Sequence, residues 1–79
     1  MPVVLRIGPC RLFFYAADVV EPVHVHVQRE DNVAKFWAAP VRLADAGGFR
    51  ASELRRIERI VTDHQTQIVE AWNAFKAQA

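Results

Sequence analysis

Two histidines stand two residues apart in the stretch EPVHVHV, which runs from Glu21 to Val27. On a β-strand this spacing directs the side chains of His24 and His26 to the same side. Imidazole titrates near neutral pH and is also a common metal ligand, so the pair could act in acid–base catalysis or bind an ion. Lys35 is expected on the neighbouring strand, where it could stabilise an anion. The candidate catalytic residues are therefore His24, His26 and Lys35.

A metal site needs more than this pair, because zinc usually takes three or four protein ligands. His64 is far away along the chain. The nearby carboxylates all fall in expected turns: Asp18, Glu21, Glu30 and Asp31. Solvated or hydrogen-bonded histidines are the commoner explanation of an isolated His-x-His pair. The sequence thus predicts no metal ion and no cofactor.

The segment that must position the histidines, residues 3–37, is dense in β-branched and aromatic residues with turn-like interruptions. Gly8-Pro9 suits a tight reversal, and Pro40 ends the region. Residues 42–49 (RLADAGGF) are expected to form a loop. The four predicted strands are VVLRI (3–7), CRLFFYAA (10–17), VHVHVQR (23–29) and VAKFW (33–37).

The pattern becomes helical between residues 51 and 77, where apolar residues recur three, four and seven positions apart. They are Leu54, Ile57, Val61, Ile68, Trp72 and Phe75. A single helix there would be about 39 Å long, whereas a globule of this size is only about 30 Å across. The segment is therefore either one helix or a pair broken near Thr62–His64. We predict one α+β domain over residues 1–79, with a four-stranded antiparallel sheet covered on one face by this helix or kinked helical pair.

The alternation along residues 23–27 assigns the valines to the core and the histidines to the opposite, open face of the sheet. Equivalent positions on the neighbouring strands share that face. The predicted binding surface comprises Arg11, Phe13, Tyr15, His24, His26, Lys35 and Trp37. A surface of this kind suits a protein partner, a second copy of the chain, or bases and phosphates of RNA.

The composition and net charge limit the kinds of partner and the cellular location that can be expected for the protein. Ten basic and nine acidic residues give a net charge of +1, which argues against a strongly basic nucleic-acid binder. The single cysteine, Cys10, has no partner within the chain and is expected as a small core residue. No apolar run is long enough to cross a bilayer. We expect a cytoplasmic protein that does not associate with a membrane.

Three stretches carry a family resemblance: EPVHVHV, then AKFW at 34–37 and EAW at 70–72. With them the chain resembles DUF4160, a family of small bacterial proteins of unknown function, over nearly all of residues 3–77. The resemblance implies no established activity. It does imply a partner, because genes of this family often neighbour those of another small domain, DUF2442, in pairs that look like toxin–antitoxin modules.

Two functional hypotheses follow. In the first, the protein is a binding component of a toxin–antitoxin-like module whose open face contacts a DUF2442-like protein or a second copy of the chain, with RNA as a further target. In the second, it is an enzyme. His24 and His26 would then serve a metal-independent ribonuclease or a divalent-metal hydrolase.

Overall fold

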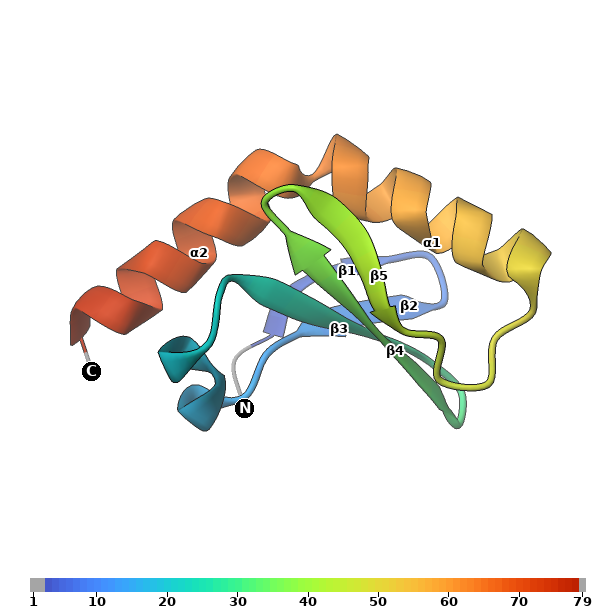
Figure 1. Ribbon diagram of the computed structural model, residues 1–79, viewed down its shortest axis with the longest axis horizontal. Coiled ribbons are helices and arrows are strands. Elements are labelled where there is room, and N and C mark those ends of the chain that lie inside the picture. Colours follow the sequence, from blue (N-terminus) through green and yellow to red (C-terminus); the bar gives the residue numbers. More distant parts are fainter. Residues whose placement is uncertain (1–2, 79) are drawn as a thin grey trace.

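The computed structural model describes residues 3–78 and shows an antiparallel sheet with two consecutive helices across one face (Figure 1). The strands follow one another in the sheet in the order β1-β2-β3-β4-β5. The predicted α+β class is confirmed, but the sheet has five strands and not four. The elements are β1 Val3–Ile7, β2 Cys10–Phe13, the 3-10 helix η1 Ala16–Val20, β3 His24–Arg29, β4 Asn32–Ala38, β5 Val41–Asp45, α1 Ala51–Asp63 and α2 Gln65–Gln78.

The additional strand, β5, lies where the sequence predicted a loop. It follows a short turn at Ala39-Pro40 and pairs with β4, so that Trp37 lies opposite Arg42 and Lys35 opposite Asp45. Apart from the half-buried Val41, every residue of β5 is exposed. An edge strand with so little buried surface does not need alternating apolar residues, so its sequence lacks the usual strand pattern.

The hydrophobic core lies between the sheet and the helices, and it is built by the residues that the alternation assigned to it. Val25 and Val27 of β3 are fully buried, as are Ala34 and Phe36 of β4 to within 1%. Leu12 of β2 joins them from the neighbouring strand. The helices contribute Ile57, Val61 and Ile68. This part of the helical stripe therefore packs on the valine face of β3, as the sequence predicted, whereas Trp72 and Phe75 pack on Phe14 at the end of the sheet.

The helical segment is broken at His64, within the stretch where the sequence allowed a break. Nδ1 of His64 lies 2.8 Å from the carbonyl oxygen of Ile60, which also accepts the backbone N–H of His64 at 3.1 Å. Nε2 of Gln65 donates to the carbonyl oxygen of Ala38 at 2.7 Å and ties the break to the end of β4. The bend lets both helices cover a molecule only 36 Å long (Figure 1).

The second strand is shorter than predicted, because β2 ends at Phe13 and the chain turns into η1. The backbone N–H of Tyr15 donates to Oδ2 of Asp18 at 2.8 Å, and the N–H of Glu21 donates to the carbonyl oxygen of Asp18 at 2.9 Å. These local bonds hold a helical turn in which no residue is buried. The turn brings Asp18 to the beginning of β3.

Candidate functional site

The predicted surface residues of neighbouring strands lie beside one another in two rows across the sheet. Phe13 is opposite His26, which in turn is opposite Lys35. His24 is opposite Trp37 in the adjacent row. The rings of Phe13 and His26 are stacked, with centroids 5.3 Å apart and planes 26° from parallel. The strand pairing therefore gathers these side chains on the sheet face opposite the one that carries Val25 and Val27.

This face is less open than the sequence suggested, because Phe13 is 1% exposed and His24 is fully buried. The indole of Trp72 in α2 covers His24, with ring centroids 5.0 Å apart. Tyr15 packs edge-on against Phe13 at 5.4 Å. The expectation of a solvated His24 is wrong, because Trp72 of α2 covers its ring. Figure 1 shows α2 extending past the end of the sheet toward η1.

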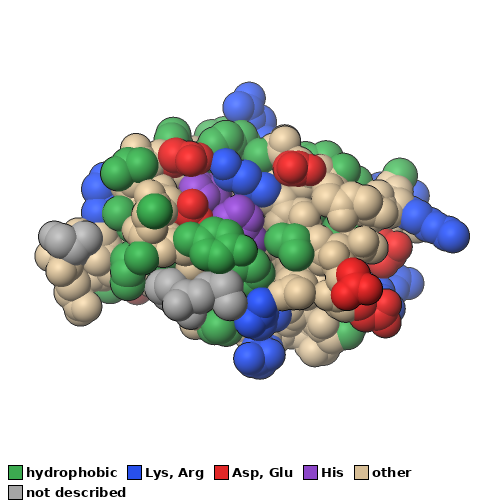
Figure 2. Space-filling view, turned by 90° about the horizontal axis from the view of Figure 1, so that it is seen from below, with side chains coloured by type: hydrophobic (Ala, Val, Ile, Leu, Met, Phe, Trp, Pro, Cys, Tyr) green, Lys and Arg blue, Asp and Glu red, His purple; other side chains and the backbone are tan. Residues whose placement is uncertain are grey.

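Both histidines converge on one carboxylate oxygen. Oδ2 of Asp18 lies 3.1 Å from Nε2 of His26 and 3.2 Å from Nε2 of His24. We call these three residues the Asp18 cluster. The side chains of Asp18 and His26 are 17% and 15% exposed, whereas that of His24 is not exposed. Figure 2 shows histidine atoms on this face, bordered by acidic, basic and apolar groups.

The hydrogen bonds of His24 define its tautomer. Nδ1 lies 3.0 Å from the carbonyl oxygen of Pro22, which can only accept, so Nδ1 carries a hydrogen. Among residues 3–78, Nε2 of His24 has no partner with acceptable hydrogen-bond geometry, although Asp18 is close to it. A buried polar atom without a hydrogen-bond partner is rare in folded proteins. The cluster therefore has a place for a proton or a cation between Nε2 and the carboxylate.

Opposing influences act on the acidity of Asp18. Burial by itself raises the pKa of the carboxyl group, because it disfavours the charged form. The hydrogen bond from the Tyr15 backbone and the interactions with His26 and His24 outweigh this effect and lower the pKa below its ordinary value. Asp18 is thus a carboxylate at neutral pH, as a metal ligand or a partner of a general base must be.

The cations around the cluster already have partners. Nζ of Lys35 lies 3.0 Å from Oε1 of Glu21 and 4.6 Å from the centre of the Trp37 ring. The guanidinium of Arg11 bonds to Gln28 and lies 4.7 Å from the centre of the Phe13 ring. Lys35 stands directly opposite His26 on β4, so its ammonium group is the cation that an anion beside the cluster would meet if the pair with Glu21 opened.

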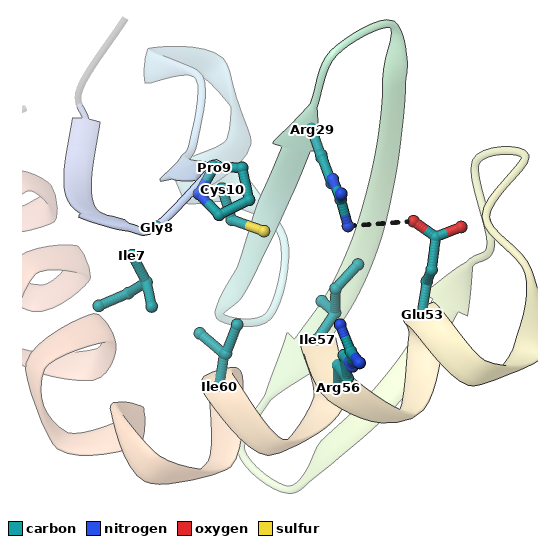
Figure 3. Close-up of a pocket in the computed structure, with 9 residues that line it drawn as sticks. All are labelled: Ile7, Gly8, Pro9, Cys10, Arg29, Glu53, Arg56, Ile57 and Ile60. Atoms are coloured by element: carbon teal, nitrogen blue, oxygen red, sulfur yellow. Dashed lines mark hydrogen bonds and ion pairs between the residues drawn. The ribbon is translucent and has the colours of Figure 1, made fainter.

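A hollow lies away from the Asp18 cluster, between the β1–β2 turn and α1 (Figure 3). Its volume is about 180 Å³, and its lining is mainly apolar. Cys10 borders it, and Arg29 and Glu53 form an ion pair at 3.5 Å across one side. Pockets that enclose a drug-sized ligand are typically about 300–1,000 Å³. This cleft is too small for such a ligand.

Sequence reasoning placed Asp18 in a turn but did not bring it to the histidines. The spacing of Tyr15 and Asp18 could have indicated this contact. An acidic residue three positions after the first residue of a helical turn can accept that residue's backbone N–H, as Asp18 does from Tyr15. A short helix at 16–20 would have shortened the second strand and directed Asp18 back toward the sheet.

The fold and the cluster together define a small α+β domain with a carboxylate and two imidazoles at the end of its sheet. The family model for DUF4160, described as a domain of unknown function, matches residues 10–73. The chain belongs to this family, and the matched range includes the whole Asp18 cluster. No curated protein and no solved structure matches the chain. No helix among residues 3–78 combines the length and apolar character needed to span a membrane.

Proposed function

We propose that the protein is the protein-binding component of a cytoplasmic, two-component module of the toxin–antitoxin type. Its docking surface is the sheet face that carries the Asp18 cluster. The observation that carries this proposal is the exposure of Val20, which is 88% accessible and follows Asp18 by two residues. An aliphatic side chain this exposed has no role in the core and is accessible to a partner.

Further exposed apolar side chains lie close to the same cluster. Tyr15 is 48% exposed, and its ring centroid is 5.1 Å from that of His26. Val3 is 41% exposed and lies opposite Phe13 at the edge of the sheet. We call Val3, Tyr15 and Val20 the apolar rim. Exposed apolar patches mark interaction sites, and tyrosine is among the residues enriched in protein interfaces. The partner is a small protein encoded beside this one, of the DUF2442 type.

The proposal is tested by co-expressing the tagged chain with the product of the adjacent gene and measuring co-purification and growth. Val20→Asp places a charge on the rim and should reduce recovery of the complex by about tenfold or more. Leu43→Asp is the matched control, because Leu43 is 46% exposed but belongs to the outer strand β5. Equal recovery with the two variants contradicts the proposal.

Self-association is separated from hetero-association by light scattering on the chain alone. A monomer that forms a complex only with the neighbouring protein supports the proposed module. A dimer that Val20→Asp dissociates would instead make a second copy of the chain the occupant of this face.

A second candidate function is hydrolysis of phosphodiesters such as RNA at the Asp18 cluster. The supporting observation is the hydrogen bond of His26 to Asp18, because a carboxylate that orients an imidazole is a common arrangement for a general base. Lys35 would meet the phosphate. RNA cleavage that is lost in His26→Gln and retained in His64→Gln would support this function, and a parallel assay with chelator separates metal-dependent from metal-independent cleavage.

A further inference from the structure

We propose that Asp18, His24 and His26 form a binding site for one divalent transition-metal ion of the zinc class. The inference goes beyond both functions proposed above, since a metal ion can be held whether or not the protein hydrolyses a substrate. It also departs from the expectation drawn from the sequence, where a third ligand for the histidines was lacking. Asp18, carried to β3 by η1, supplies that ligand.

Two of the three spacings between the ligand atoms match a tetrahedral ion. With zinc bonds of about 2.0–2.1 Å to nitrogen and oxygen, two ligand atoms stand about 3.3 Å apart. The two distances from Oδ2 of Asp18 to the imidazole nitrogens are 3.1 and 3.2 Å. The potential ligand atoms of the three side chains all lie within 4.8 Å of one another. The nitrogens of the two imidazoles are thus at most 4.8 Å apart, and the rings would have to converge on the ion to reach the tetrahedral spacing of about 3.3 Å.

The buried histidine is already oriented as a metal ligand. Histidines that bind metals usually donate the other ring N–H to a carboxylate or a backbone carbonyl, which fixes the tautomer. Nδ1 of His24 has such a partner in the carbonyl oxygen of Pro22 at 3.0 Å. Nε2 is then left with its lone pair directed into the cluster, fully buried and without an acceptable hydrogen bond among residues 3–78. A neutral imidazole and a carboxylate repel each other at this point unless a cation lies between them.

The composition and exposure of the cluster indicate the kind of ion and its coordination. Imidazole ligands favour zinc and neighbouring transition metals, whereas magnesium and calcium prefer sites made of oxygen ligands alone. Three protein ligands leave a fourth position for water. The partial exposure of Asp18 and His26 places that position toward solvent, on the face seen in Figure 2.

The alternative occupant is a proton, which would make His24 an imidazolium paired with Asp18. Calorimetric titration of the chelator-stripped, full-length chain with Zn²⁺ separates the two. One saturable site per chain is expected, and Co²⁺ in its place should give the visible absorption of a tetrahedral complex. Mg²⁺ at the same concentration should not compete.

Three variants assign the site to these residues. Loss of a residue that only hydrogen-bonds a metal ligand typically weakens metal binding by about 10–100-fold. Asp18→Asn and His26→Gln, which remove direct ligands, should therefore each weaken it by about 100-fold or more. His64→Gln is the matched control, because His64 is the remaining histidine and lies at the break between α1 and α2. It should leave the zinc affinity unchanged.

Folding of the variants is checked by circular dichroism and by thermal unfolding without metal. Zn²⁺ should raise the midpoint of the wild-type chain and of His64→Gln, but not that of the folded Asp18→Asn chain. The proposal is overturned if the wild-type chain shows no saturable binding, or if binding survives in the double variant Asp18→Asn/His26→Gln. Zinc binding without any hydrolysis would reject the second candidate function and leave the metal site intact.

Discussion

At His24 the chemistry of the site and the packing of the fold favour different side chains. Its ring lies between two indoles, with centroid distances of 5.6 Å to Trp37 and 5.0 Å to Trp72. An apolar ring would suit these surroundings better than an imidazole, because a buried polar group that is incompletely hydrogen-bonded costs free energy. A histidine placed here is therefore better explained by its chemistry than by its packing.

Replacing His24 with Phe tests this explanation. Buried polar groups can often be replaced by apolar groups of similar shape with little loss of stability, so the free energy of unfolding of His24→Phe should stay within about 1 kcal/mol of wild type or increase. His24→Ala, which leaves a cavity, should lose about 2–4 kcal/mol. Urea titrations in the presence of chelator provide both values. If Phe proves as costly as Ala, the imidazole has a structural role.

Cys10 provides a prediction on thiol reactivity. The residue is 7% exposed, and burial raises the pKa of its thiol, with Glu53 adding to the effect and Arg29 opposing it. The thiolate is the reactive form. At pH 8, iodoacetamide should therefore label the folded chain at a rate of at most about one tenth of that of the chain unfolded in urea. Similar labelling rates in the two states would contradict this.

The same shift has a consequence for stability. The folded chain keeps the Cys10 thiol protonated to a higher pH than the unfolded chain does. The unfolded state therefore binds fewer protons in this range, and the stability falls as the pH rises past the ordinary pKa of a thiol. The Cys10→Ala chain, compared with wild type over alkaline pH, should show a smaller decline.

At the scale of elements, the loop from β5 to α1 depends on Gly47. Its φ angle is +60°, and a Cβ atom there would lie 1.9 Å from the carbonyl oxygen of Val33 in β4. Gly8, in the turn between β1 and β2, has a similar φ of +54° but nothing within 4 Å of such an atom. Comparing substitutions at the two glycines therefore separates the cost of a left-handed backbone conformation from the cost of a steric clash.

Gly8→Ala should cost about 1–2 kcal/mol, the usual cost of a left-handed conformation for an L-residue. Gly47→Ala should cost clearly more, because the loop must also move away from the backbone of β4. Thermal unfolding followed by circular dichroism gives the comparison. Equal losses in the two variants would show that the loop can shift freely, and that α1 does not depend on this contact.

The elements that could be predicted from the sequence are those that bury one face. Val25 and Val27 alternate with the histidines, and Ile57, Val61 and Ile68 recur at helical spacing, so their burial is encoded locally. The outer strand β5 buries almost nothing and is held by backbone pairing with β4. Its formation depends on a neighbouring strand being present, which no local pattern reports.

The site was only partly predictable for the same physical reason. The phase of β3 placed His24 and His26 together, and strand pairing added Phe13, Lys35 and Trp37. Burial of His24 depends on Trp72, which lies 48 residues later in the sequence and contacts it only after α2 has packed. The approach of Asp18 depends on η1, a turn held by backbone and side-chain bonds of a few neighbouring residues.

At the scale of the whole molecule, two apolar regions share one helix. Ile68 of α2 belongs to the core between sheet and helices. Trp72, one turn later, packs on His24 and on Phe14, whose ring centroid is 5.0 Å away. Phe75 extends this second group, with its centroid 5.5 Å from that of Phe14. The end of the sheet that holds the Asp18 cluster is therefore coupled to the main core through α2 as well as through β2 and β3, which contribute side chains to both.

This coupling predicts that the site and the fold are lost together. The environment of Trp72 changes when the cluster opens, so tryptophan fluorescence reports on the site, whereas far-ultraviolet circular dichroism reports mainly on α1 and α2. A domain of 79 residues with a radius of gyration of 11.6 Å buries too little surface to form two cores that unfold independently. The two probes should give the same urea midpoint. A fluorescence transition at lower urea would show instead that the cluster opens while the core persists, and Trp37→Phe would then identify Trp72 as the source of the signal.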